Sequence, residues 1–122
     1  MKILIIEDNS SISSMLVKYL NKKNFDAMDT DNARNGLELI QKNNFDVVIL
    51  DLNMPKFSGW DFLKKINSDG LVLKSKIIVL TASVITSEQE MELEQLGINL
   101  LLKKPIDPDD LIAKIHDTKE LK

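Results

Sequence analysis

Acidic side chains follow two apolar segments of the chain, at the points where these segments end. Glu7 and Asp8 come directly after the apolar run 3–6, and Asp51 follows the run 47–50. Three carboxylates held close together repel one another unless a proton or a cation neutralises them. Oxygen ligands without cysteine or a nearby histidine favour Mg²⁺, which takes carboxylates together with waters and phosphate oxygens. These residues predict a magnesium site, with Asp8 and Asp51 as direct ligands and Glu7 acting through a water.

A hydroxyl and an ammonium group close two further apolar segments, at Thr81 and Lys104. Together with Asp51 as a carboxylate nucleophile, they are typical of a site that accepts a phosphoryl group. Lys104 would pair with one phosphoryl oxygen, and Thr81 would donate its hydroxyl to another. Ala82 is small and leaves room for the phosphoryl donor. The alternatives are a solvated acidic rim, or an Asp51 that only begins a turn or caps a helix.

The segments that carry these residues alternate between two hydrophobic periodicities. Short apolar runs predict strands over 3–6, 25–30, 47–50, 77–80 and 98–102. A helical spacing of apolar residues follows each run, with helices beginning near Asn9 or Ser10, Asn32, Gly59, Ser87 and Asp107. Five strand and helix pairs predict an α/β fold, a flavodoxin-like doubly wound (βα)5 sheet of parallel strands in the order 2-1-3-4-5 with helices on both faces.

This strand order predicts where the polar residues meet. Strands one and three lie side by side at the switch point, so Glu7, Asp8 and Asp51 would converge at the carboxyl edge of the sheet. Thr81 and Lys104 would line the same edge.

Two helices differ in the strength of their signals. The first carries a regular apolar stripe that we expect to be core, made of Ile12, Met15, Leu16, Tyr19 and Leu20. The fourth has a poor stripe between a capping-box pair, Ser87 and Glu90, and a helix-ending Gly97. We therefore expect the fourth helix to be lightly anchored.

Length and composition limit the classes of function. The 122 residues suit one domain spanning 1–122, with 43% hydrophobic and 29% charged residues. The net charge of −3 is interspersed, which argues against direct nucleic-acid binding and against a membrane surface. No cysteine occurs, and the amino-terminal apolar run is too short for a signal or membrane segment. We expect a cytoplasmic protein.

The ordered set of strand-end residues resembles the receiver domain of two-component response regulators. The matching residues are Glu7-Asp8, the segment Asp-Leu-Asn-Met-Pro that begins at Asp51, Thr81-Ala82, and Lys104-Pro105. The resemblance covers essentially the whole chain. It implies a phosphoprotein of two-component, or phosphorelay, signal transduction that assists its own phosphorylation and dephosphorylation but is not otherwise an enzyme.

The resemblance also implies partners and further site residues. The phosphoryl donor would be a phosphohistidine on a sensor histidine kinase or a histidine phosphotransfer protein. The main-chain carbonyl of Asn53 would be another Mg²⁺ ligand, and the bond between Lys104 and Pro105 would be cis. Phosphorylation would rearrange the face made by the fourth helix, fifth strand and fifth helix, which would signal to a downstream protein target as a monomer or a phosphorylation-dependent dimer.

One position of this face departs from the family pattern. The fifth strand commonly carries an aromatic residue three positions before the lysine, and this chain has Leu101 there. Output then depends either on the loop after Thr81 and the fourth helix alone, or on a partner that contacts Leu100, Leu101 and Lys103 directly.

Three other functions share parts of this pattern. An aspartate-nucleophile phosphatase would need a second acid two residues after the nucleophile, where this chain has Asn53. A receiver-fold binding module that is not phosphorylated should have lost at least one site residue. A flavin-binding protein would need a phosphate-cradling loop where Glu7 and Asp8 repel phosphate. We expect a receiver domain without an effector domain.

Overall fold

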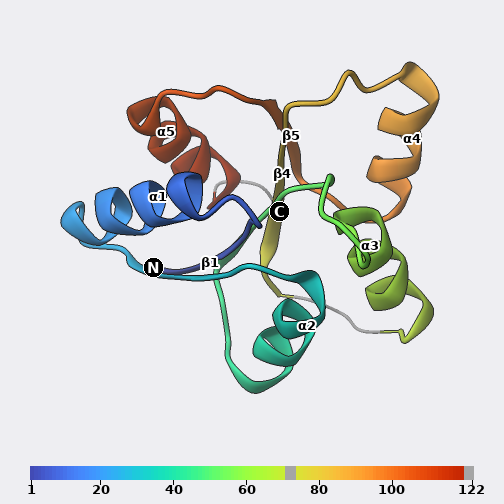
Figure 1. Cartoon of the computed structure of the whole chain (residues 1–122), viewed down its shortest axis with the longest axis horizontal. Helices are drawn as coiled ribbons and strands as arrows, with labels where there is room; N and C mark the ends of the chain where they lie inside the picture. The colour runs from blue at the N-terminus through green and yellow to red at the C-terminus, as the bar shows by residue number, and fades with distance from the viewer. Residues whose placement is uncertain (71–73, 120–122) are drawn as a thin grey trace.

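Strands and helices alternate along the whole of the chain that the computed structural model describes, residues 1–70 and 74–119 (Figure 1). The elements are β1 (Lys2–Ile6), α1 (Ser10–Lys22), β2 (Asp26–Thr30), α2 (Ala33–Lys42), β3 (Val47–Leu50), α3 (Gly59–Ser68), β4 (Lys76–Thr81), α4 (Ser87–Gln95), β5 (Leu100–Lys103) and α5 (Pro108–Lys119). In these residues the strands form one parallel sheet in the order β2-β1-β3-β4-β5. The predicted fold is confirmed.

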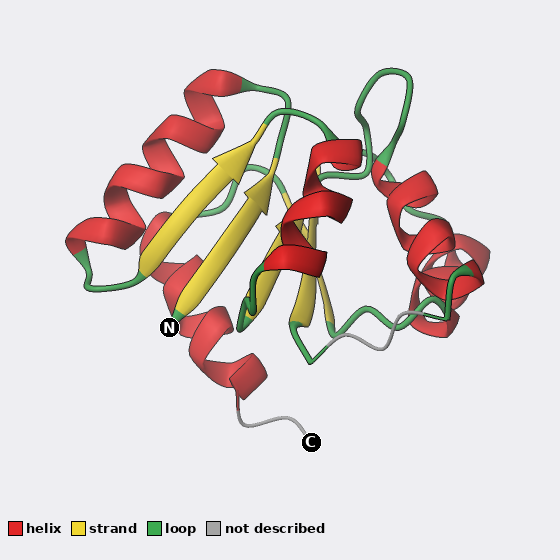
Figure 2. Ribbon diagram, turned by 90° about the horizontal axis from the view of Figure 1, so that it is seen from below, coloured by secondary structure: helices red, strands yellow, loops and turns green. Residues whose placement is uncertain are grey.

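Helices cover both faces of the sheet, as Figures 1 and 2 show. Helices α1 and α5 lie on one face, and α2, α3 and α4 lie on the other. Successive strand residues point to opposite faces, so β1, β3 and β4 each contribute to two separate cores. Residues such as Ile3, Ile5 and Ile49 pack in the core with α1 and α5, whereas Leu4 and Leu50 pack in the core with α2, α3 and α4. Burial on both faces explains the uninterrupted apolar runs.

The register of the central strands places their carboxyl ends together. Ile6 of β1 is paired with Leu50 of β3, so the chain leaves both strands at the same level. The amide of Asp51, the first residue after β3, donates a hydrogen bond of 3.0 Å to the carbonyl of Ile6. Glu7 and Asp51 therefore follow directly from the buried ends of two neighbouring strands.

The first helix is capped as expected but packs differently from the prediction. The Asn9 side chain accepts hydrogen bonds from the amides of Ser11 and Ile12. Leu16 and Leu20 are buried, but Met15 is 44% exposed. The prediction of Met15 as core is wrong, because the small residue Ser13 takes a buried position on the helix instead.

The fourth helix begins with a different capping box from the one predicted, whereas Gly97 follows its end with a positive φ of 94°, as predicted. Its capping box joins Thr86 and Gln89, one residue before the expected pair, because Thr86 has an extended backbone and the helix begins at Ser87. Leu93 is the one buried residue among those described in this helix, which agrees with light anchoring.

The fifth strand begins two residues later than predicted. The amide of Ile98 donates to the carbonyl of Leu93 and so completes the end of α4. Asn99 then exchanges two hydrogen bonds with Ile77, one through its own amide and one through its side-chain oxygen, both 2.8 Å long. These bonds hold 98–99 as a connection, and the strand runs over Leu100–Lys103.

Candidate functional site

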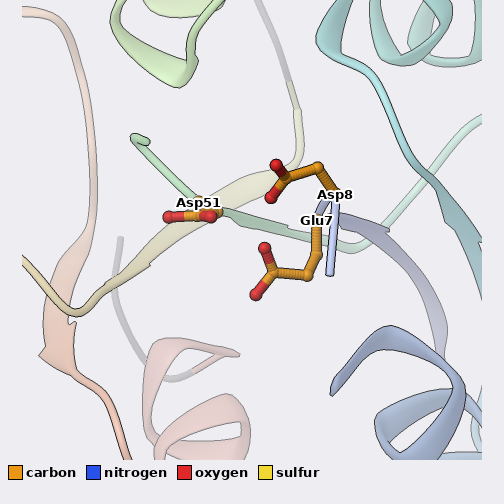
Figure 3. Close-up of side chains that lie close together, drawn as sticks. All are labelled: Glu7, Asp8 and Asp51. Atoms are coloured by element: carbon orange, nitrogen blue, oxygen red, sulfur yellow. The ribbon is translucent and has the colours of Figure 1, made fainter. Parts of the chain in front are cut away.

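Three carboxylates meet at the carboxyl edge of the sheet, as Figure 3 shows. Glu7 and Asp8 follow β1, and Asp51 follows β3. One carboxylate oxygen from each residue lies within 4.8 Å of the other two. Glu7 and Asp51 are buried, whereas Asp8 is exposed to solvent. The convergence expected from the strand order is present, with one open side at Asp8.

Lys104 supplies the positive charge beside this cluster. Its ammonium group donates a hydrogen bond to Oε1 of Glu7 and lies 3.5 Å from Oδ2 of Asp51. The amide of Lys104 donates to the carbonyl of Thr81 at 2.9 Å, which holds the lysine at the end of the sheet. The cation therefore contacts two of the three acids.

Glu7 has the most perturbed carboxyl group of the site. Burial, and then the neighbouring Asp51 carboxyl group, raises the pKa of Glu7 from 4.5 to about 7, against the opposing effect of Lys104. The Glu7 side chain is 4% exposed, and Oε2 is a buried oxygen that has no hydrogen-bond partner among residues 1–70 and 74–119. An unsatisfied buried oxygen of this kind is costly and indicates a missing proton or cation.

The donor atoms at this edge fit a divalent cation. All the ligands offered are carboxylate oxygens, which hard cations such as Mg²⁺ prefer. The unpartnered Oε2 of Glu7 and the close approach of three acids are both relieved by added positive charge. The open side at Asp8 leaves space for waters or a phosphoryl group.

Thr81 and Asn53 are joined at this edge by a residue that the sequence analysis did not identify. The amide of Ser83 donates to the Thr81 hydroxyl oxygen at 3.1 Å, and the Ser83 hydroxyl accepts a hydrogen bond from the Asn53 side chain. The main-chain amide of Asn53 also donates a hydrogen bond to Oδ1 of Asp51 at 3.2 Å. Ser83 lies two residues after Thr81, as Asn53 does after Asp51, and that matching spacing was the available signal.

Gly59, the first residue of α3, is a second residue to which the sequence analysis gave no role in the site. Its amide donates to the carbonyl of Leu52 at 3.2 Å. A Cβ atom at this position would overlap the Asp51 carbonyl oxygen and lie 2.8 Å from the Leu52 Cα. Only glycine permits this close approach of α3 to the backbone of the site.

The other predicted residues are Ala82, Leu101 and Pro105. Ala82 is exposed next to the buried Thr81. Lys104 and Pro105 are joined by a cis peptide bond, as expected. Leu101 is half-buried and packs on the side of the sheet that α4 covers, away from the carboxylates.

Comparison with known proteins identifies the family of this chain and agrees with its fold. A family model of the response regulator receiver domain matches residues 3–116. The chain belongs to the response regulator receiver family. This receiver domain is therefore a member of a family of signalling phospho-acceptors.

A curated relative and two solved structures illustrate the likeness of the receiver domain. The cell cycle response regulator CtrA of Brucella ovis is 30% identical over 116 residues, which are 95% of this chain and 49% of that protein. The chemotaxis protein CheY4 of Vibrio cholerae is 28% identical, with a TM-score of 0.86 over 96% of this chain and 97% of that chain. The response regulator TrrA of Thermotoga maritima, in complex with Mg²⁺ and BeF, is 26% identical, with a TM-score of 0.78 over 96% and 97%.

The chain spans about half the length of the curated relatives it matches. Within the residues that the structure describes, no helix has both the length and the apolar character needed to cross a membrane.

Proposed function

We propose that this receiver domain accepts a phosphoryl group on Asp51 from a phosphohistidine of a sensor histidine kinase or a histidine phosphotransfer protein. The observation that carries the proposal is the convergence of Glu7, Asp8 and Asp51 with the Lys104 ammonium at one edge of the sheet. In the transfer, an Asp51 oxygen forms a bond to phosphorus as the bond between phosphorus and the donor imidazole nitrogen breaks. The imidazole leaves with that electron pair and takes a proton from solvent.

Four residues of the chain would hold a magnesium ion for this reaction. They are Asp8 and Asp51 directly, Glu7 through a water, and Asn53 through its main-chain carbonyl. The ion, when bound, supplies charge neutralisation for the phosphoryl oxygens. A solved structure of TrrA in complex with Mg²⁺ and BeF supports this assignment by similarity.

Two side chains would act on the phosphoryl group itself. The Thr81 hydroxyl already accepts a hydrogen bond from the Ser83 amide, so its own proton is available for a phosphoryl oxygen. The Lys104 ammonium lies close enough to Asp51 to pair with an oxygen of the newly bound group. Ala82, beside Thr81, presents little bulk to an incoming donor.

The phosphorylated domain would act through protein contacts. The surface of α4, β5 and α5 would shift to its other conformation as Thr81 is drawn toward the phosphoryl group. Leu101 and Pro105 lie in the segments that would change conformation. We propose that the target is a protein and that this signalling takes place in the cytoplasm.

Intact mass after incubation with acetyl phosphate tests the proposal. The native chain, Asp51→Asn and the exposed control Asp26→Asn are compared with and without Mg²⁺. We expect a single phosphoryl adduct on the native chain and on Asp26→Asn, only when Mg²⁺ is present, and none on Asp51→Asn. A folded native chain that binds Mg²⁺ but gains no adduct would overturn phospho-acceptance and favour a receiver-fold binding module.

A further inference from the structure

The sequence contains a single arginine, Arg34, among its sixteen lysine and arginine residues. It is the second residue of α2, and the first turn of this helix contains no acidic residue. A cation in the first turn is opposed by the helix dipole, so Arg34 does not stabilise α2 through its charge. Because α2 follows β2, one of the parallel strands, Arg34 lies near the same edge of the sheet as the carboxylates.

Arg34 lies against an aromatic ring in the loop 52–58, which connects β3 to α3. The Cζ atom of Arg34 is 4.4 Å from the centre of the Phe57 ring, the shortest of the cation–ring distances among residues 1–70 and 74–119. The quadrupole of an aromatic ring attracts a cation placed over its face. Hydrogen bonds from Ser58 lower the pKa of Asp61 most, and nearby cations, Arg34 among them, lower it further. The guanidinium group therefore contacts the loop beside the start of α3.

The middle of this loop has few other attachments. At one end the amide of Asn53 donates to Oδ1 of Asp51, and at the other the amide of Ser58 donates to Oδ2 of Asp61 at 2.9 Å. Within the part of the chain that the structure describes, residues 54–57 take part in no hydrogen bond. Side-chain contacts must therefore hold this segment.

The backbone of the same segment adopts a conformation that favours another residue type. Lys56 has a positive φ of 67°, in the left-handed region that side chains other than that of glycine rarely occupy. Packing on either side of Lys56 compensates for this. Met54 is 7% exposed, and Phe57 is half-buried against the core formed with α2, α3 and α4. Phe57 thus contacts both the core and the exposed Arg34, and it joins the loop to α2.

From these contacts we infer that Arg34 is a positioning residue for magnesium binding, acting through the Phe57 ring on the loop that carries the Asn53 carbonyl. Asn53 lies four residues before Phe57 in this loop. A ligand whose backbone is fixed before the ion arrives loses less conformational freedom on binding, so a fixed loop raises the affinity. The inference rests on the proposed function for the identity of the ion and of this ligand.

The charge of Arg34 and its positioning role predict opposite effects on the affinity for Mg²⁺. A cation that acted through its charge alone would repel Mg²⁺, so its removal would strengthen binding. Loss of the contact with Phe57 would weaken binding instead. We expect Arg34→Ala to weaken Mg²⁺ binding about threefold in calorimetric titration, as the loss of an exposed cation–π contact would. The control Lys42→Ala, which removes a cation from the last turn of α2, should not weaken binding.

Substitutions of Phe57 test whether Arg34 acts through the ring. Phe57→Leu keeps an apolar side chain but removes the ring, so it should weaken Mg²⁺ binding. In the Phe57→Leu background, Arg34→Ala should weaken binding no further, whereas independent effects would multiply. Phe57→Tyr keeps the ring and should retain both the native affinity and the threefold effect of Arg34→Ala. Urea unfolding without Mg²⁺ verifies that each variant is folded, and the Phe57→Tyr pair still tests the inference if Phe57→Leu is not.

The opposite results would overturn the inference. Unchanged or stronger Mg²⁺ binding by Arg34→Ala would do so, as would an undiminished effect of that substitution in the Phe57→Leu background. A native chain that binds no Mg²⁺ would overturn it together with the magnesium site. If acetyl phosphate gave no adduct at Asp51 while Arg34 and Phe57 affected Mg²⁺ binding as expected, phospho-acceptance would fail and the positioning role would stand.

Discussion

The ammonium nitrogen of Lys104, which follows β5, lies 3.5 Å from Oδ2 of Asp51, which follows β3, although β4 separates these two strands. The same nitrogen donates a hydrogen bond to Glu7. One cation thus stands between two buried carboxylates whose mutual repulsion it reduces. Removing it would leave both acids without an ion-pair partner among residues 1–70 and 74–119.

Lys104→Met is expected to lower the free energy of unfolding by about 3 kcal/mol at alkaline pH without Mg²⁺, because buried charges lose their partner. The loss should be smaller at acidic pH, where Glu7 is protonated. Urea unfolding measures both values. The neighbouring Lys103→Met removes an exposed lysine and should change stability by less than about 0.5 kcal/mol. Equal losses in the two variants would contradict the role of Lys104.

The raised pKa of Glu7 predicts a stability that falls with rising pH. The native state holds a proton on Glu7 up to about pH 7, whereas the unfolded state releases it near the usual value of 4.5. Between these two pKa values the native state binds more protons than the unfolded state. The stabilisation from the Glu7 proton is therefore complete below the unfolded-state pKa and is lost as the pH rises through the folded-state pKa. The slope should approach about 1.4 kcal/mol per pH unit in Mg²⁺-free urea unfolding. Glu7→Gln should flatten this dependence; an unchanged slope would disprove the assignment.

Magnesium binding should depend on whether the Glu7 carboxyl group is protonated. Because a cation and a proton compete for Glu7, we expect the affinity for Mg²⁺ to rise as pH increases through the Glu7 pKa of about 7. Calorimetric titration below and above that pH measures the effect. In Glu7→Gln the affinity should be lower and should vary less with pH. A native affinity that is constant across this range would show that Glu7 takes no part.

Gly59→Ala is expected to destabilise the chain by about 1–3 kcal/mol, because the added methyl group overlaps the backbone at Asp51 and Leu52. Gly36→Ala is the matched control in α2. Its Cβ would lie 2.6 Å from Cδ1 of Ile6, the flexible end of a side chain that can move, and alanine also favours the helix. Denaturant unfolding should therefore show a clearly smaller loss for Gly36→Ala. The reverse order would mean that the approach of α3 to the site is not tight.

The capping box of α4 can be tested with two adjacent hydroxyl residues. Thr86→Ala should destabilise α4 by about 1 kcal/mol, since the Thr86 side chain accepts a hydrogen bond from the Gln89 amide. Ser87→Ala should have little effect, because Ser87 is the first helical residue. Hydrogen exchange of the α4 amides, measured by mass spectrometry, should become faster in the first variant alone. Faster exchange in Ser87→Ala instead would favour the pair predicted from sequence.

The order of the strands and the meeting of the site carboxylates could be predicted because they depend on strong signals. Buried parallel strands are continuous apolar runs, and the polar residues that end them must lie at one edge of the sheet. This single rule predicts the positions of Glu7, Asp51, Thr81 and Lys104 in the fold. Their assigned roles in phosphoryl transfer go beyond it and stay predictions.

The details that could not be predicted depend on tertiary packing. Thr86 and Ser87 both stand three residues before a glutamine or glutamate, so spacing alone cannot choose between the two caps. Met15 lies on the predicted apolar stripe, but α1 turns the face of Ser13, Leu16 and Leu20 toward the core, which leaves Met15 exposed. The overlap that excludes a side chain at Gly59 exists only once α3 is packed against Asp51.

Because of the tight contact at Gly59, α3 is anchored more firmly than α4. On one side, α3 buries Gly59, Phe62, Leu63 and Ile66 and touches the backbone of Asp51 itself. On the other side, α4 is held by the buried side chain of Leu93. A force that arises between these two helices will displace the less firmly anchored one. We therefore expect strain generated at the acidic edge of the sheet to displace α4 more than α3.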